Sequence, residues 1–148
     1  MVEGVGHNHA LPRRVRHRDG AARAHERRSG NGSGERIEGR AIGLLVNNPL
    51  HLGGAIDADA ADKAARFMQL CNAHGLPIVS LVDTPGFMVG PDTESTAQVR
   101  HVSRMFVAAA HLRVPLLSVV LRKGYGLGAM AMTGGGFHET LSTVAWPT

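Results

Sequence analysis

The sequence predicts an α/β protein with a mostly parallel sheet and crossover helices, preceded by a disordered basic tail. Short apolar runs bounded by glycine, asparagine or proline indicate strands that are buried on both faces. Longer stretches with apolar residues three and four apart separate these runs and indicate helices. Strands that alternate with helices in this way are typical of right-handed crossover units in a parallel sheet.

The beginning of the chain differs from the rest in charge and in periodicity. Residues 1–34 carry seven arginines and three acidic residues, whereas residues 35–148 carry nine basic and nine acidic groups. The first segment has almost no large apolar side chains, so it buries too little surface to offset its chain entropy. We therefore predict a disordered basic tail over residues 1–35, with a glycine- and serine-rich linker at 30–34, and one domain over 36–148.

The predicted elements of the domain follow in the order strand, helix, strand, helix, strand. The strands are predicted over 41–46, 77–83 and 114–121, and the helices over 57–74 and 93–111. In the first helix, one apolar face consists of Ala64, Phe67, Met68 and Cys71, and Asp57 or Asp59 can cap the start. In the second helix we expect Val99, Val102, Phe106 and Ala110 to face inward. A glycine turn leads into a helix over 124–132, and a further strand is predicted to begin within 141–146.

Composition excludes several classes of protein. The single cysteine, Cys71, excludes an intrachain disulfide and a cysteine-rich zinc site, and it fits a reducing, cytoplasmic location. The apolar runs are too short to span a membrane. The histidines are scattered, and the acidic residues at 57, 59 and 62 are interpreted as helix-capping groups, so we expect no bound metal. No Gly-x-Ser-x-Gly hydrolase motif occurs.

Several stretches of the domain, in order and at their spacings, match one family. They are residues 43–50 (GLLVNNPL), 53–57 (GGAID), 62–67 (DKAARF), 76–87 (LPIVSLVDTPGF), 100–106 (RHVSRMF), 122–126 (RKGYG) and 145–148 (AWPT). Over about residues 36–148 the chain resembles part of the C-terminal subdomain of the carboxyltransferase (β) subunit of biotin-dependent acyl-CoA carboxylases. This group includes acetyl- and propionyl-CoA carboxylases and methylmalonyl-CoA carboxyltransferases. The resemblance implies an incomplete crotonase-like fold.

The resemblance also implies a reaction. The family transfers a carboxyl group from carboxybiotin to the α-carbon of an acyl-CoA such as acetyl- or propionyl-CoA. Negative charge develops on the enolate oxygen of the thioester and on the ureido oxygen of biotin, and backbone N–H groups at glycine-rich turns stabilise each charge. In the family, the N-terminal subdomain supplies the enolate site and the C-terminal subdomain supplies the biotin site. The N-terminal subdomain has no counterpart in the matched region.

The biotin-side turn corresponds to residues 122–129. The resemblance assigns the catalytic backbone donors to Leu127 and Gly128, although Leu127 stands where the family often has glycine. Contacts with biotin or substrate are expected from Gly86, Phe87, Gly124, Tyr125, Gly126 and Met130. Two alternatives remain open for this turn: a tight strand-to-helix connection without a ligand, and a dinucleotide-binding loop.

The charged residues near the turn also leave alternatives. Asp83, at the end of a predicted strand, either lines the biotin pocket or caps the loop that follows it. Arg122 and Lys123 either neutralise a CoA phosphate or are solvated charges at a strand end. Met130 is compatible with several acyl groups, so the acyl chain of the substrate stays undetermined.

Partners and function follow from the resemblance. The expected cofactor is biotin carried on another protein or domain, with acyl-CoA as substrate. The expected partners are a biotin carboxyl carrier, a biotin carboxylase, the N-terminal carboxyltransferase subdomain and further copies of the chain, but no membrane. One alternative is a truncated, non-catalytic remnant of such an enzyme. A weaker alternative is a nucleic-acid-binding module through residues 11–28, which the lack of aromatic residues for base stacking disfavours.

Overall fold

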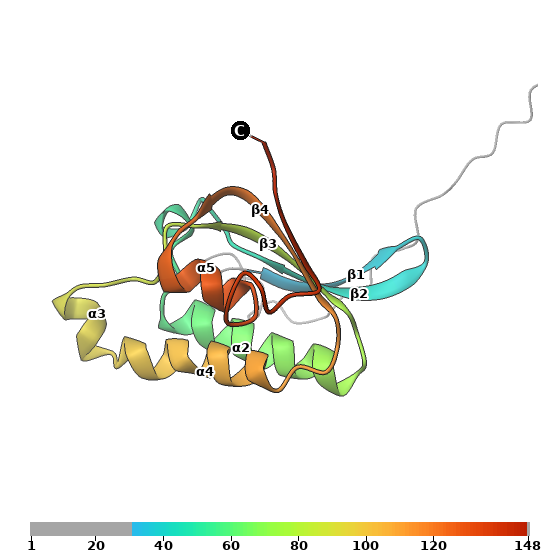
Figure 1. Ribbon diagram of the computed structural model, residues 1–148. Helices are drawn as coiled ribbons and strands as arrows, with labels where there is room; N and C mark the ends of the chain where they lie inside the picture. The colour runs from blue at the N-terminus through green and yellow to red at the C-terminus, as the bar shows by residue number, and fades with distance from the viewer. Residues whose placement is uncertain (1–30, 148) are drawn as a thin grey trace, which may run out of the picture.

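A computed structural model describes residues 31–147, which form one sheet with helices against it (Figure 1). The sheet has five strands: β1 (Asn31–Ile37), β2 (Arg40–Val46), β3 (Ile78–Thr84), β4 (Leu116–Gly124) and β5 (Ser142–Ala145). The helices are η1 (Leu52–Gly54, a 3-10 turn), α2 (Ala58–Ala73), α3 (Pro91–Ser95), α4 (Gln98–Ala110) and α5 (Gly126–Met132).

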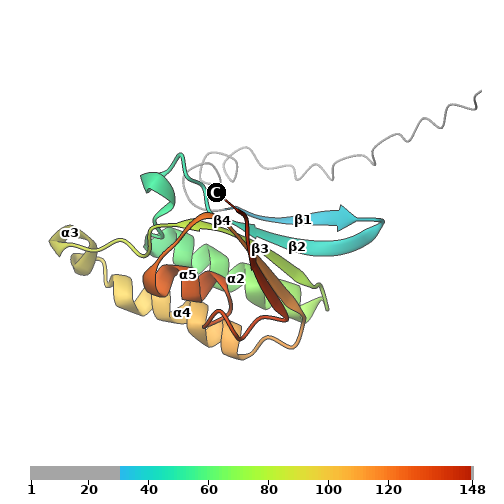
Figure 2. The ribbon, with the colours of Figure 1, turned by 45° about the horizontal axis from the view of Figure 1, so that its top comes forward.

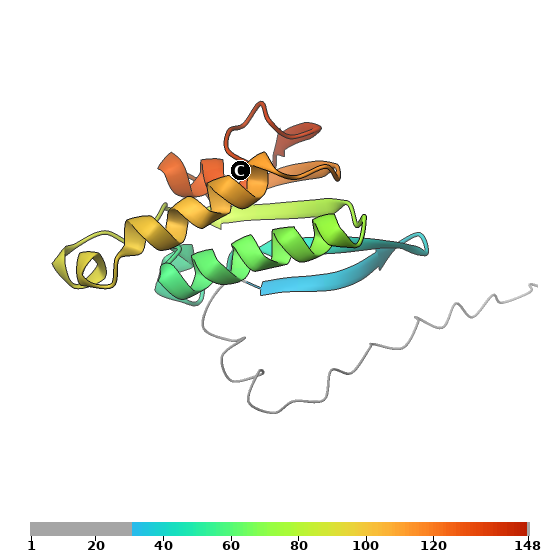
Figure 3. The same cartoon turned by 90° about the horizontal axis from the view of Figure 1, so that it is seen from below.

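The strands lie in the sheet in the same order as in the chain. β1 and β2 form an antiparallel hairpin, which extends beyond the rest of the sheet (Figure 2), and β2, β3, β4 and β5 are parallel to one another. Helices connect the parallel strands, and α2 and α4 lie side by side across one face of the sheet (Figure 3). The predicted α/β class with a mostly parallel sheet and crossover helices is confirmed.

The core fills the space between this face and the helices. Its largest fully buried side chains include Met68, Ile78, Val82 and Met105, and alanines fill much of the remainder. Each large side chain stabilises the fold by about 1.5–3 kcal/mol when it is fully buried. The alanines of α2 and α4 lack bulky side chains, so these helices can approach the sheet and each other closely. The carboxyl ends of β3 and β4 are thereby held at one edge of the molecule.

Helix α2 matches its prediction closely. Asp57 is the N-cap, and its side chain accepts a hydrogen bond of 2.8 Å from the backbone N–H of Ala60. Met68 and Cys71 on the predicted apolar face are fully buried. Phe67 is half-buried and packs against the two glycines that face it, Gly32 in β1 and Gly43 in β2.

Strand β1 corrects the predicted domain boundary. Residues 31–35, which the sequence placed in the disordered tail, pair in register with β2. Their stabilisation comes from backbone pairing, and a side chain on Gly32 would collide with the ring of Phe67, with a Cβ only 2.5 Å from it. Glycine is therefore required here by close packing, and it does not mark a linker. The disorder predicted for residues 1–30 lies outside the described residues.

The second predicted helix is two helices. α3 and α4 are separated at Thr96 and Ala97, where Ala97 adopts a left-handed backbone (φ 55°). In α4, Val102 and Phe106 pack against the core as predicted, but Val99 is 77% exposed and Ala110 is also exposed. The inward position at the start of α4 belongs to Gln98, whose Nε2 donates to the carbonyl of Ile56 (2.9 Å).

The last three elements, β4, α5 and β5, are of the predicted types. β4 begins two residues later than predicted and continues to Gly124, α5 follows the glycine turn, and β5 pairs with β4. Within residues 31–147, no helix is long and apolar enough to cross a membrane. The same residues contain no group of three or more His, Cys, Asp or Glu side chains placed to hold a metal ion.

Candidate functional site

The turn between β4 and α5 leaves two backbone N–H groups without a backbone acceptor. Tyr125 is the N-cap of α5 in an extended conformation, and Gly126 adopts a left-handed backbone (φ 58°). The first N–H of the helix with a backbone acceptor is that of Ala129, which donates to the carbonyl of Tyr125 (3.3 Å). Among the described residues, the N–H groups of Leu127 and Gly128 have no acceptor, as expected for the first turn of a helix. Neither N–H group is used by the backbone of the described residues.

This turn rests directly on the loop that follows β3. The N–H of Tyr125 donates to the carbonyl of Thr84 (3.2 Å). A Cβ on Gly128 would lie 2.7 Å from the backbone of Gly86 and 3.0 Å from the nitrogen of Phe87. Glycine at 128 is therefore required for the two backbones to touch. The structure thus brings Gly128 against Gly86 and Phe87, which lie about 40 positions earlier in the sequence.

The outer side of the turn is open. Tyr125 and Leu127 are 60% and 61% exposed, and a Cβ on Gly126 would meet no atom within 4 Å. Met130 lies one turn further along α5 and is half-buried. Gly124 has a different place, since a Cβ there would lie 2.9 Å from the side chain of Val120, inside the structure. The exposed part of the turn is therefore formed by Tyr125, Gly126 and Leu127, whereas Gly128 is buried against the loop of Gly86.

Asp83, Arg122 and Lys123 form an ion-pair cluster beside the turn. The buried Asp83 carboxylate accepts from Arg122 Nη2 (2.9 Å) and from the backbone N–H of Lys123 (3.3 Å), and Lys123 Nζ lies 3.8 Å from it. Lys123 Nζ also donates to the carbonyl of Gly53. These contacts favour the interpretation that Asp83 ties the ends of β3 and β4 together. The two cations are engaged with protein groups.

Sequence reasoning missed several residues that support this arrangement. Asn47 accepts the N–H of Asp83 with its Oδ1 (3.0 Å), and Gly54 leaves no room for a side chain beside the carbonyl of Asp83. Thr84 bonds to Gly86 through its hydroxyl. The run Asn47-Asn48-Pro49 after a strand marks a turn in the sequence, but nothing in the sequence shows that the Asn47 side chain reaches the neighbouring strand.

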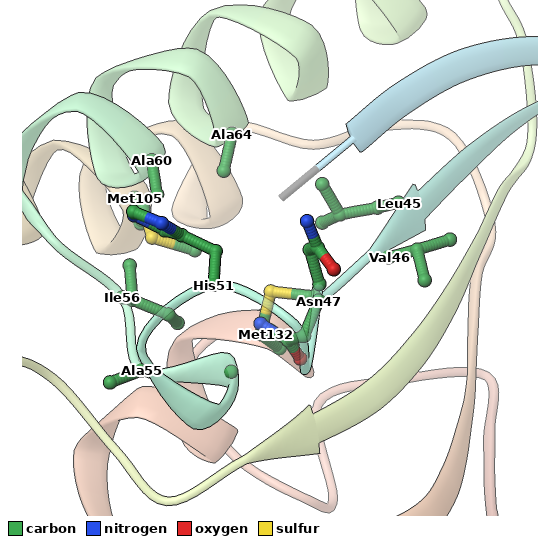
Figure 4. A pocket seen from close by; sticks show the side chains of 12 residues that line it. Leu45, Val46, Asn47, His51, Ala55, Ile56, Ala60, Ala64, Met105 and Met132 are labelled. Carbon is green, nitrogen blue, oxygen red and sulfur yellow. The ribbon is translucent and has the colours of Figure 1, made fainter. Parts of the chain in front are cut away.

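A pocket lies apart from the turn, between the end of β2 and the helices (Figure 4). Its empty volume is about 350 Å³, of which part is open to solvent. Its polar lining includes Asn47 and His51, and His51 Nε2 lies 3.2 Å from Asp57 Oδ2; the apolar lining includes Met105 and Met132. None of its lining residues belongs to the turn at 124–130. The predicted site residues are thus outside this pocket.

Comparison with known proteins gives the class. Residues 34–148 match the model of the carboxyl transferase domain. The chain is 42% identical over 112 residues to the biotin-dependent acetyl-/propionyl-coenzyme A carboxylase beta6 subunit of Mycobacterium tuberculosis (strain H37Rv), which covers 76% of this chain and 24% of that protein. It is 41% identical over 113 residues to the propionyl-CoA carboxylase beta chain of Saccharopolyspora erythraea, with 76% and 20% covered.

Solved structures agree with this class. A single-chain, multi-domain long-chain acyl-CoA carboxylase matches with a TM-score of 0.78 and 61% identity, over 79% of this chain and 12% of that chain. The 12S transcarboxylase, solved as a hexamer with methylmalonyl-coenzyme A bound, matches with a TM-score of 0.75 and 36% identity, over 80% and 23%. Both are carboxyltransferases of crotonase-like fold, and the α/β fold of this chain is the same.

The chain belongs to the carboxyl transferase domain family. It is therefore related to the β subunits of biotin-dependent acyl-CoA carboxylases, as its motifs indicated. It spans about a quarter or less of the length of the curated relatives reported above. The fold and the family of this chain are thus established. The activity of its full-length relatives is considered below as a proposal.

Proposed function

We propose that this chain provides the biotin-side half of a carboxyl-transfer site. The reaction moves a carboxyl group from carboxybiotin to the α-carbon of acetyl- or propionyl-CoA. The observation that carries the proposal is the pair of unbonded N–H groups at Leu127 and Gly128, on a turn whose sequence matches the family. The acyl-CoA side of the site comes from the other subdomain of the family, which the matched region of this chain does not cover.

The residues at the turn fit biotin. Bound biotin supplies the carboxyl group, and its ureido oxygen gains negative charge as the N–C bond to that group breaks. The N–H groups of Leu127 and Gly128 donate to this oxygen, and the positive end of the α5 dipole adds to the stabilisation. Gly126 leaves space for the approach, and Tyr125, Phe87 and Gly86 border it. Met130 contacts the acyl group in this proposal.

The partners follow the same logic. The relatives are biotin-dependent by name, so we infer that biotin reaches the turn on a biotin carboxyl carrier that a biotin carboxylase loads. A further copy of the chain and the second subdomain complete the site in the proposal. In this proposal the components act together in the cytoplasm.

A reconstitution experiment tests the proposal. The full chain is mixed with the missing subdomain of a relative, a carboxylated biotin carrier and propionyl-CoA, and transfer of a radiolabelled carboxyl group is measured. Leu127→Pro removes one donor N–H in the first turn of a helix, where proline is tolerated. We expect the rate to fall about 100-fold or more, as for other lost oxyanion donors.

Leu127→Ala is the matched control, because it changes the same side chain and keeps the N–H. It is expected to retain the rate within about three-fold, since no donor is lost. Equal rates for the proline and alanine variants would show that the Leu127 N–H takes no part. If the wild-type mixture transfers no carboxyl group and the chain does not bind biotin, the chain is a non-catalytic remnant, as in the alternative.

A further inference from the structure

Thr84 lies next to residues 125–128, the segment called here the donor turn, and its hydroxyl makes two hydrogen bonds to one residue, Gly86. Its side chain is fully buried, and its hydroxyl accepts the N–H of Gly86 (3.1 Å) and donates to the carbonyl of the same residue (3.1 Å). Gly86 has a φ of 132°, a conformation that residues with side chains rarely adopt. The hydroxyl therefore holds both polar backbone groups of a residue that has little intrinsic preference for its conformation.

Gly86 is the surface on which the donor turn sits. The backbone of Gly128 is packed so tightly on Gly86 that a Cβ would come within 2.7 Å of it. The carbonyl of Thr84 also accepts the N–H of Tyr125 (3.2 Å), at the other end of the turn. Both ends of the segment 125–128 are thus supported by Thr84 and Gly86. A shift of Gly86 is transmitted to Gly128 because no flexible side chain lies between them.

We infer that Thr84 is a positioning residue: its hydroxyl fixes Gly86 and thereby aims the N–H groups of Leu127 and Gly128. This inference rests on the proposed function, in which these two groups bind the ureido oxygen of biotin. Thr84 does not touch the ligand. Ile56 also donates to the Gly86 carbonyl (3.0 Å), so the loop keeps one anchor when the hydroxyl is removed.

The test compares Thr84→Val with Thr84→Ser in the full chain. Valine keeps the shape of threonine without its hydroxyl, and serine keeps the hydroxyl without its methyl group. We expect the valine variant to shift the ¹H–¹⁵N NMR signals of Gly86, Leu127 and Gly128 and to weaken binding of free biotin about five-fold, the effect of one lost buried hydrogen bond. The serine variant is expected to keep the NMR signals and the biotin affinity of the wild type.

Thr133→Val is the matched control. Thr133 is also fully buried, and its hydroxyl donates to the carbonyls of Ala129 and Met130 at the far end of the same helix. Its loss is expected to lower the unfolding midpoint while leaving the Leu127 and Gly128 signals and biotin binding unchanged. A similar response from both valine variants would mean that Thr84 only stabilises the fold, and would overturn the inference.

The remaining outcomes are also decisive. Unchanged Leu127 and Gly128 signals in Thr84→Val would overturn the inference directly. If the valine variant does not fold, Thr84→Ala replaces it under the same criteria. If wild-type chain does not bind biotin, the proposed function loses its support, whereas the NMR signals still show whether Thr84 aims the two N–H groups.

Discussion

Two aspartates each hold two basic side chains, in different surroundings. The Asp83 side chain, at the end of β3, is 10% exposed and pairs with Arg122 and Lys123 of β4. The Asp62 side chain, on α2, is 35% exposed and pairs with His101 Nδ1 (2.8 Å) and Arg104 (2.7 Å) of α4. The first pairing joins neighbouring strands beside the donor turn, and the second joins neighbouring helices at the outer surface.

This difference shows how burial changes the contribution of similar ion pairs to the stability of the fold. A buried carboxylate depends on its protein partners, because it has lost most of its hydration. Asp83 accordingly also accepts a backbone N–H, while its own N–H donates to Asn47. An exposed carboxylate keeps much of its water, so its ion pairs contribute little. We therefore expect the strand cluster to dominate stability and the geometry of the turn.

The largest effect is expected at Asp83. Asp83→Asn removes the charge that Arg122 and Lys123 share, but it keeps a side chain of the same shape. Because Arg122 is largely exposed and can regain water, we expect a loss of about 2 kcal/mol in the free energy of unfolding, below the cost of breaking a fully buried pair. Urea denaturation followed by circular dichroism measures it.

Asp92→Asn is the control for this change, because Asp92 is an exposed acid in α3. It should alter the free energy of unfolding by less than about 0.5 kcal/mol. Equal losses in the two variants would break the comparison, since burial would then have no influence.

We expect acid to lower the free energy of unfolding in part by protonating Asp62. Partial burial acts to raise the pKa of this carboxyl, but hydrogen bonds and positive charges from His101 and Arg104 outweigh it and lower the pKa below its usual value. A lowered folded-state pKa means that the contribution is present above about pH 4 and is lost as pH falls through the lowered value. We expect Asp62→Asn to remove this part of the acid dependence, which is less than about 1 kcal/mol for so exposed a pair.

Unfolding midpoints of wild type and Asp62→Asn between pH 2 and pH 6 check this expectation. The two curves should differ at pH 6 and approach each other as the pH falls towards 2. A constant difference across the range would contradict a role for ionised Asp62.

The smallest effect on the free energy of unfolding is expected at Arg104, and it should depend on the salt concentration. Arg104→Gln breaks one surface ion pair and should cost a few tenths of a kcal/mol in dilute buffer. In 1 M NaCl the cost should vanish, because the screening length falls to about 3 Å. Arg66→Gln, on the exposed surface of α2, is the control and should show no salt-dependent cost. A cost that persists in 1 M NaCl would indicate packing rather than charge.

The sequence predicted the parallel strands and α2 well because their signals are local. Each strand is a short apolar run between turn residues, and α2 has both a capping aspartate and a regular apolar face. The glycine turn before α5 was also predicted, and α5 begins at Gly126, whereas the role of the Leu127 and Gly128 N–H groups stays a prediction. Local patterns suffice for such features.

Features that depend on tertiary contacts escaped prediction. The rotation of α4 is set by a polar residue, Gln98, that reaches Ile56 across 42 positions of sequence, so an apolar pattern pointed to Val99 instead. The break before α4 occurs at Ala97, which carries no glycine or proline signal. In β1, Gly32 fits against Phe67, a contact that composition cannot show. Thr84 bonds locally to Gly86, but the sequence does not show that the backbone of Gly128 packs on that residue.

The agreement between strand order in the sheet and strand order in the chain has a consequence for biosynthesis. On the ribosome, residues emerge from the N-terminus, so the hairpin of β1 and β2 is available first. Each later strand can then be added at the same growing edge as soon as its crossover helix has emerged. Among the five strands of residues 31–147, none must be inserted between two that are already paired, so these strands can be added without undoing earlier contacts.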